Sequence, residues 1–275
     1  MNFIEKLTKA AQKNNSLLCV GLDPDPTLMP GKLSVFEFNK AIIDATSDLV
    51  CAYKPNFAFY EAMGNGGLDT LKRTVDYIPA DIPVIGDAKR GDIGNTAKAY
   101  ATSIFSYFNF DATTVNPYLG FDSVEPFLQY RDKGIFILCR TSNAGAVDFQ
   151  SLHCKSGDSH HPLFEIVAQK VNEWNTHGNL GLVIGATYPE ELRLIRQSHP
   201  DIPLLIPGIG AQGGDLELII RYGVDKQGQK AIINSSRQII YASHGEDFAQ
   251  AARHAASELR DQINYYLSIL PTQSC

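Results

Sequence analysis

The stretch "DIPVIGDAKRGDIGNT", residues 81–96, passes from an apolar run into a charged turn and then into a helical pattern. The apolar run is typical of a buried β-strand. Four charged side chains follow within six positions, namely Asp87, Lys89, Arg90 and Asp92. Because burying charge is costly unless the charges are paired, a core strand that ends in this way points to an ion-pair network or a functional site.

The same strand, turn and helix pattern recurs along the chain. Most of the predicted strands are continuous apolar runs, which is typical of strands covered on both faces of a parallel sheet. The predicted strands are residues 16–23, 49–56, 81–89, 111–117, 134–142, 180–187, 202–210 and 230–236. The predicted helices are residues 34–48, 67–77, 93–107, 122–131, 162–177, 188–198, 213–222 and 246–267.

Eight βα units in 275 residues predict an α/β fold, a (β/α)8 TIM barrel with parallel strands. A doubly wound open sheet is the alternative. We find no linker-like segment and expect a single domain over residues 1–275. Residues 143–161 are polar and show no periodicity. We interpret them as a long βα loop after the fifth strand, where long loops often act as lids.

Composition limits the possible partners and the compartment. A net charge of -6 makes nucleic acid or an anionic membrane a poor partner. The cysteine count of five is odd, and no pair has the spacing of metal ligands. The N-terminal residues lack the pattern of a signal peptide, and no apolar run is long enough to span a membrane. We therefore expect a soluble cytoplasmic protein without a metal site.

Polar side chains end several of the predicted apolar strands. In (β/α)8 barrels the chemistry takes place at the carboxyl ends of the strands. The polar residues at these ends are Asp23, Lys54, Asp87, Lys89, Thr141 and Ser142. All of them are expected at one end of the barrel.

Alternation along a strand should direct Asp87 and Lys89 to the same side, and Arg90 to the other as a structural or surface charge. Simpler alternatives remain open. Asp87 and Lys89 would then form only a structural ion pair, and Asp92 would be a helix N-cap. Neither alternative explains why the first two strands end in Asp23 and Lys54.

A second signal points to a phosphate site. The loop "PGIGAQGGD", residues 207–215, follows the seventh strand and contains Gln212, and Arg237 follows the eighth strand. Backbone N–H groups of a glycine-rich loop before a helix bind anions, and an arginine fork grips phosphate oxygens. Barrels often carry a phosphate site between these two strands. The alternative for the glycine-rich loop is a flexible turn.

Taken together, these residues resemble the orotidine 5'-phosphate decarboxylase family, in its longer bacterial subgroup. The D-x-K-x-x-D pattern is matched by Asp87, Lys89 and Asp92, and it is continued by Ile93 and Thr96. The aspartate, the lysine, the glycine-rich loop and the arginine at the other strand ends match in order. The resemblance covers nearly the whole predicted barrel.

The resemblance implies a carboxy-lyase of de novo pyrimidine biosynthesis, which converts orotidine 5'-phosphate to UMP and CO2 without a cofactor or metal. It implies that Lys89 donates a proton to C6 of the pyrimidine and that Asp87 lies against the substrate carboxylate. Lys54 and Asp92 would complete an alternating array of charges.

The resemblance also implies a homodimer with shared active sites, in which Asp92, Ile93 and Thr96 enter the site of the other chain. The remaining implied substrate contacts are Asp23 to a ribose hydroxyl, Ser142 to the pyrimidine, and Gln212 and Arg237 to the phosphate.

Two rival functions remain at this point. The first is a Mg2+-dependent sugar-phosphate decarboxylase or aldolase of the same superfamily. It would need a further metal-binding carboxylate, for which Glu61 is the candidate. The second is a nucleotide-phosphate binder without catalysis, which would use Gln212 and Arg237 but not Lys89.

Overall fold

The computed structural model describes residues 1–209 and 215–270, in which eight strands build one parallel sheet. Each strand overlaps one of the predicted apolar runs. The strands are β1 (Leu18–Leu22), β2 (Ala52–Pro55), β3 (Ile85–Arg90), β4 (Ala112–Val115), β5 (Gly134–Arg140), β8 (Leu180–Ile184), β9 (Leu204–Pro207) and β10 (Ala231–Ser235).

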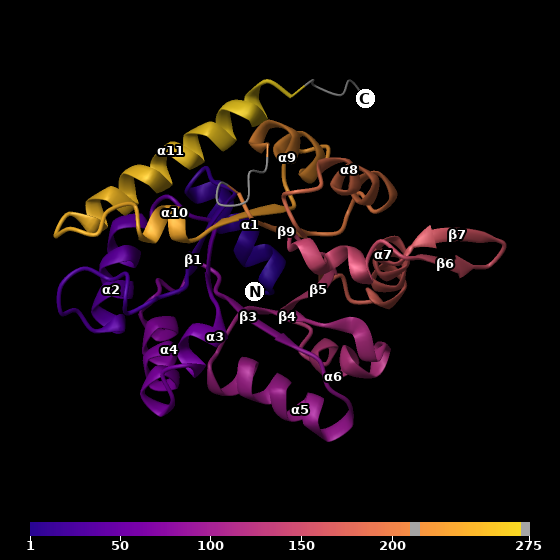
Figure 1. The fold of residues 1–275 in the computed structure, drawn as a ribbon, viewed down its shortest axis with the longest axis horizontal. Coiled ribbons are helices and arrows are strands. Elements are labelled where there is room, and N and C mark those ends of the chain that lie inside the picture. Colours follow the sequence, from indigo (N-terminus) through magenta and orange to yellow (C-terminus); the bar gives the residue numbers. More distant parts are fainter. Residues whose placement is uncertain (210–214, 271–275) are drawn as a thin grey trace.

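The sheet closes on itself (Figure 1). Its strand order is β2-β1-β10-β9-β8-β5-β4-β3, which leaves β2 and β3 at the two ends. Parallel bridges join these ends at Tyr53–Val84 and Asn56–Asp87, and the Tyr53 amide donates to the Pro83 carbonyl at 3.1 Å. The predicted (β/α)8 barrel is confirmed, and the open-sheet alternative is wrong.

Helices surround the barrel, with one across its end. They are α1 (Phe3–Lys13), α2 (Val35–Thr46), α3 (Phe57–Glu61), α4 (Asn65–Tyr77), α5 (Gly94–Thr102), α6 (Glu125–Leu128), α7 (Leu163–Trp174), α8 (Pro189–Ser198), α9 (Leu216–Gly223), α10 (Arg237–Ile240) and α11 (Phe248–Ser268). A π-helical turn, η1 (Ser103–Tyr107), continues α5. No helix in the described ranges has both the length and the apolar character of a membrane span.

Residues 143–161 are more ordered than the sequence suggested. They contain a 3-10 helix, η4 (Ala144–Asp148), and most of an antiparallel hairpin of β6 (His153–Ser156) and β7 (Ser159–Pro162). The hairpin projects from the side of the barrel (Figure 1). All its residues are exposed or half-buried, so no apolar alternation marks it in the sequence.

The apolar core has two parts. One fills the barrel interior, where every strand of the closed sheet contributes one buried residue: Cys19, Ala52, Ile85, Ala112, Phe136, Val183, Leu205 and Ile232. The other lies between the strands and the surrounding helices and contains residues such as Leu18, Phe38 and Leu71. Burial on both faces explains why the strands are continuously apolar.

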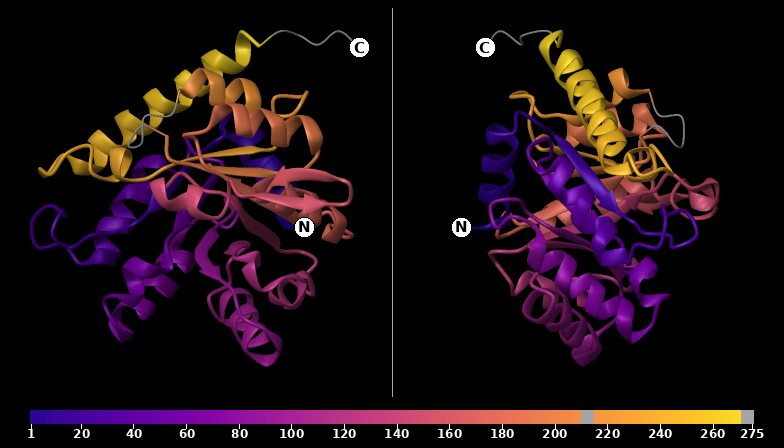
Figure 2. Two further views of the ribbon diagram at one scale, coloured as in Figure 1. Left: turned by 45° about the vertical axis from the view of Figure 1, so that its right-hand side comes forward. Right: turned by 90° about the vertical axis from the view of Figure 1, so that its left-hand side faces the viewer.

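Helix α1 closes one end of the barrel interior. The side chains of Phe3 and Leu7 belong to the interior cluster, and the Phe3 ring meets Phe136 edge-on at 5.7 Å. The ring sits against Gly134, where a Cβ atom would lie 2.4 Å from it. In the right-hand view of Figure 2, α1 lies on the opposite side of the barrel from the β6–β7 hairpin. The carboxyl ends of the strands are thus left as the open mouth.

We expect Phe3→Ala to lower the free energy of unfolding by about 3 kcal/mol or more, because it opens a cavity in the barrel interior. Urea denaturation measures the effect. Tyr265→Ala is the control, since this aromatic side chain on α11 is 60% exposed and its loss should change stability by about 0.5 kcal/mol or less. Equal stability of the two variants would show that α1 does not help to hold the barrel together.

Candidate active site

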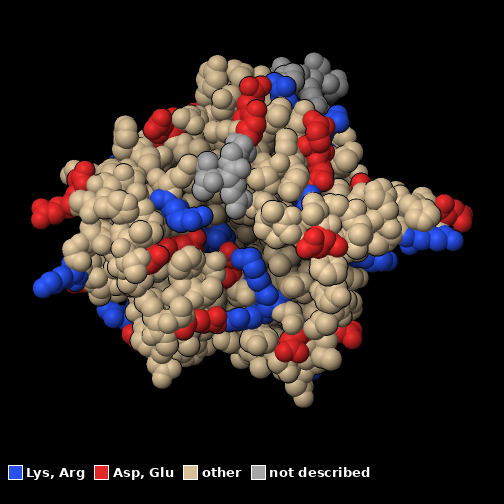
Figure 3. Space-filling model, viewed as in Figure 1, with Lys and Arg blue, Asp and Glu red and all other residues tan. Residues whose placement is uncertain are grey.

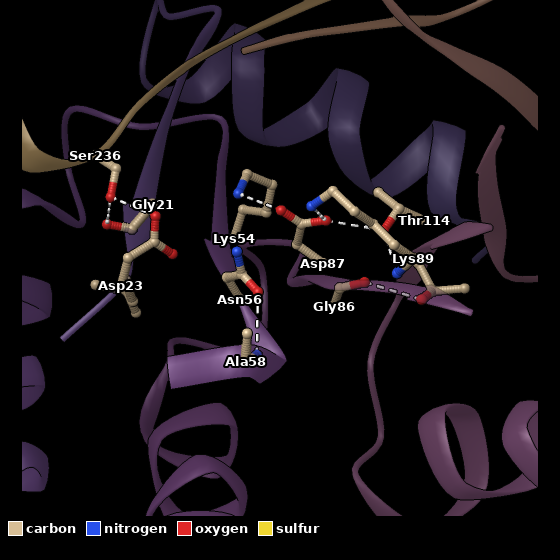
Figure 4. A network of polar contacts seen from close by, with 12 residues as sticks. Gly21, Asp23, Lys54, Asn56, Ala58, Gly86, Asp87, Lys89, Thr114 and Ser236 are labelled. Carbon is tan, nitrogen blue, oxygen red and sulfur yellow. Dashed lines mark hydrogen bonds and ion pairs between the residues drawn. The ribbon is translucent and has the colours of Figure 1, made fainter. Parts of the chain in front are cut away.

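Three charged side chains meet at the mouth of the barrel (Figure 4). The Asp87 carboxylate lies between two ammonium groups: Lys54 Nζ donates to Oδ2 at 3.1 Å, and Lys89 Nζ donates to Oδ1 at 2.6 Å. Asp87 and Lys54 are buried, whereas the Lys89 side chain is 48% exposed. Lys89 therefore presents the ammonium that a ligand in the mouth can reach.

The ion pairs keep the buried groups charged. Burial by itself would raise the pKa of Asp87, but the ammonium groups of Lys54 and Lys89 outweigh burial and hold this pKa well below its ordinary value. Burial would lower the pKa of Lys54, but the carboxylates of Asp87 and Asp23 outweigh it and hold this pKa above its ordinary value. Each charge compensates for the desolvation of the other.

A β-bulge produces the contact between Asp87 and Lys89. Gly86 pairs with Thr113 and Arg90 pairs with Val115, so the three residues of β3 from 87 to 89 face Thr114 alone. Lys89 has a φ of 48°, in the left-handed region. The two side chains meet as the sequence predicted, but the bulge brings them together and regular strand alternation does not.

Arg90 belongs to a structural cluster beside the site. Its guanidinium pairs with the Glu61 carboxylate and lies 5.5 Å from the ring centroid of Phe57 and 5.2 Å from that of Tyr100. These contacts fit the predicted structural role of Arg90. They also engage Glu61, the carboxylate considered for a metal site.

Asp23 follows β1 and faces the same mouth. Its Oδ2 accepts a hydrogen bond from Ser236 Oγ at 2.6 Å. Its Oδ1 is buried and has no hydrogen-bond partner within residues 1–209 and 215–270. Such an acceptor suits a ligand hydroxyl. No pattern in the sequence singles out Ser236, because its neighbours Ser235 and Arg237 are polar as well and could equally face a ligand.

Asp92 and Ile93 lie on the connection from β3 to α5, and Thr96 is in the first turn of α5. Ile93 is the N-cap of α5, and no side chain among the described residues caps the helix, so the N-cap alternative for Asp92 is wrong. In the described part of the chain, the Asp92 carboxylate bonds only the Ile93 amide, at 2.8 Å. Thr96 is exposed, and the large apolar side chain of Ile93 is 54% exposed.

The start of the loop that holds Ser142 is tightly fixed. The Gln150 side chain accepts from the Thr141 amide at 2.8 Å and donates to Thr141 Oγ1 at 2.8 Å. The buried Arg140 donates to Glu191 of α8 at 2.5 Å and stacks on the Tyr188 ring. Ser142 is half-buried next to these contacts.

The structure describes only one of the two side chains that are predicted to bind the phosphate. Arg237 is the first residue of α10 and is exposed. Gln212 lies outside the described residues.

Figure 3 shows basic and acidic side chains gathered in a hollow near the middle of the face that is seen in Figure 1. In residues 1–209 and 215–270, no cluster of three or more His, Cys, Asp or Glu side chains forms a metal-binding group.

The fold and the mouth thus define a (β/α)8 barrel enzyme with a Lys–Asp–Lys array at the carboxyl ends of its strands. Comparison with known proteins identifies its family. Residues 16–253 match the "Orotidine 5'-phosphate decarboxylase / HUMPS family", and the chain belongs to this family.

Individual relatives agree with the family match. The chain is 55% identical over 266 residues to the orotidine 5'-phosphate decarboxylase of Dehalococcoides mccartyi, covering 97% of this chain and 98% of the relative. It is 50% identical over 275 residues to the enzyme of that name from Ralstonia nicotianae, covering 97% and 99%. The solved OMP decarboxylase of Leishmania donovani superposes with a TM-score of 0.86 at 41% identity, covering 98% and 100%. These names do not favour the sugar-phosphate alternative.

We expect Asp87→Asn to destabilise the protein more at neutral than at acid pH. The folded-state pKa of Asp87 is depressed, so its contribution is present above the unfolded pKa and is lost as the pH falls toward the folded pKa. The stability gap between the wild-type protein and the variant should therefore narrow from about pH 7 to about pH 3. Urea denaturation at both pH values measures the gap, and a constant gap would contradict the ionised pair.

Proposed function

We propose that this protein decarboxylates orotidine 5'-phosphate to UMP and CO2, as a carboxy-lyase of de novo pyrimidine biosynthesis, and that Lys89 is its proton donor. The exposed Lys89 ammonium, held 2.6 Å from Asp87 at the open end of the barrel, is the observation that carries the assignment of the proton donor. The family and the names of the relatives support the overall reaction. Lys54, Asp87 and Lys89 provide the charges that the reaction needs.

Three contacts would orient the substrate. Asp23 Oδ1, which has no partner in the described part of the chain, would accept a hydrogen bond from a ribose hydroxyl. The exposed Arg237, together with Gln212, would bind the phosphate, and Ser142 would contact the pyrimidine. Because the phosphate is remote from the reacting carbon, its binding energy can position the ring over the charged array.

The reaction then follows from the charges. The bond between C6 and the carboxylate carbon breaks, CO2 leaves, and the electron pair stays at C6. The Lys89 ammonium stabilises this developing charge and transfers a proton to C6, and the resulting amine regains a proton from solvent. Asp87 would lie against the substrate carboxylate, where repulsion between the two anions is relieved as CO2 departs. Lys54 keeps Asp87 ionised.

The site would be completed by a second copy of the chain. Asp92 does not join the array of its own chain, and the neighbouring Ile93 is exposed. We therefore place Asp92, Ile93 and Thr96 in the site of the partner subunit, with Asp92 as the next charge after Lys89. This arrangement requires a homodimer with two shared sites.

We further propose a single domain over residues 1–275 in a cytoplasmic protein. The main core cluster includes residues from Leu17 to Ile263, so strands and helices from both halves of the chain pack together. Cys19, Cys51 and Cys139 are buried free thiols. Burial raises the pKa of Cys19 to about 12, so this thiol is protonated and behaves as an apolar side chain. A reducing compartment suits such cysteines.

Purified protein should convert orotidine 5'-phosphate to UMP, which the change in ultraviolet absorbance records, with equal rates in the presence and absence of EDTA. Lys89→Ala should lower kcat by at least about 1,000-fold, because both the stabilising charge and the proton are removed. Binding of UMP should persist, since the phosphate contacts are intact. Near-normal turnover in the variant would rule out this proton donor, and strong inhibition by EDTA would favour the metal-dependent rival.

Mixing two inactive variants, Asp92→Ala and Lys89→Ala, should restore activity after subunit exchange. Random exchange makes half of the dimers mixed, and each mixed dimer has one intact site, so about a quarter of the wild-type sites should return. Each variant incubated alone is the control and should stay inactive. Absence of any recovery, once exchange has been verified by native mass spectrometry, would contradict shared sites.

A further inference from the structure

One buried hydroxyl contacts both halves of the Asp87–Lys89 pair. Thr114 of β4 is 1% exposed, and its Oγ1 accepts a hydrogen bond from the Lys89 amide at 2.9 Å. The same oxygen donates to Asp87 Oδ1 at 2.9 Å. A hydroxyl can donate one hydrogen bond and accept others through its lone pairs, so the two bonds are compatible. Figure 4 shows Thr114 beside both residues.

The bulge creates the need for this hydroxyl. Since residues 87–89 face Thr114 alone, the regular ladder of backbone bonds is interrupted there. The Lys89 amide would be left without a ladder partner, and Thr114 Oγ1 supplies one. The bond is partly buried, and a backbone amide removed from water needs a partner, so this bond stabilises the bulged backbone.

The same bond supports a strained conformation. Lys89 has a φ of 48°, a region that residues other than glycine adopt only where the surroundings enforce it. In this conformation the Lys89 side chain turns back, and its Nζ reaches Asp87 Oδ1 at 2.6 Å. The position of the ammonium therefore depends on the backbone that Thr114 holds.

We propose that Thr114 is a positioning residue for the proton donor, and that it sets where the Lys89 ammonium and the Asp87 carboxylate stand relative to C6 of the substrate. This inference rests on the proposed decarboxylation and extends it to a residue that contacts no substrate. Without the hydroxyl, the Lys89 amide loses its partner and Asp87 Oδ1 loses one of its two donors. The ammonium then moves away from the position in which it protonates C6.

The neighbouring Thr113 offers a matched control. Its side chain is also fully buried on β4, and its Oγ1 donates to a β3 group, the Gly86 carbonyl, at 2.8 Å. That bond stands outside the charged array. Thr113→Val and Thr114→Val thus remove one hydroxyl each from adjacent positions of the same strand, but only the second change reaches the Asp87–Lys89 pair.

We expect Thr114→Val to lower kcat by roughly 10- to 100-fold, because a hydrogen bond to a charged group and the backbone support of Lys89 are lost together. KM and the affinity for UMP should stay close to wild type, because the phosphate and ribose contacts are untouched. Thr114→Ser keeps the hydroxyl and should recover most of kcat. Thr113→Val should lose comparable stability in urea denaturation while retaining wild-type kcat.

Several outcomes would overturn the inference. These are a wild-type kcat in Thr114→Val, an equal fall of kcat in Thr113→Val, or a fall in Thr114→Ser as large as that in Thr114→Val. If Thr114→Val does not fold, Thr114→Ala removes the same hydroxyl and is judged by the same criteria. Failure of the proposed function is separate, since the wild-type protein would then produce no UMP from orotidine 5'-phosphate.

Discussion

The Asp87 carboxylate, buried between the ammonium groups of Lys54 and Lys89, is the interaction on which the site depends. Three charges can be held at the ends of two neighbouring apolar strands only because opposite charges offset the desolvation of the buried groups. Barrel closure brings them together. Lys54 stands on β2 and Asp87 on β3, the two ends of the strand order, and the Asn56–Asp87 bridge joins these strands beside the pair. In an open sheet of this strand order the two residues would lie on opposite edges and could not pair.

One end of the barrel contributes stability, and the other end contains the functional site. At one end, Phe3 and Leu7 of α1 complete the apolar interior, so this end contributes stability. At the other, the strands stop in polar residues, and the structure tolerates a left-handed Lys89 and an Asp23 oxygen that has no hydrogen-bond partner among the described residues. Such features reduce stability and are typical of functional sites, where geometry matters more than the most stable local arrangement. The stability that α1 contributes at the closed end offsets the cost of these features at the mouth.

Much of the fold and of the charged site could be predicted because both follow from local patterns. Buried parallel strands read as apolar runs, and the polar residues that end them are brought to one face by the barrel. The hairpin over residues 153–162 was missed because neither face is buried, which removes the alternation that marks a strand. Thr114 and Ser236 were missed because their partners are 27 and 213 residues away in the chain. No short-range pattern reports such contacts.

By itself, the sequence determined the eight βα units and the charged residues Asp23, Lys54, Asp87 and Lys89 at the strand ends, and it separated Arg90 from them as a structural or surface charge. Only the tertiary structure decided how the charges meet. The bulge opposite Thr114, the φ of 48° at Lys89 and the burial of Lys54 against Asp87 all arise from the pairing of separate strands. The physical reason is that residue type and periodicity act over a few positions, whereas register and the desolvation of a charge depend on neighbours supplied by distant parts of the chain.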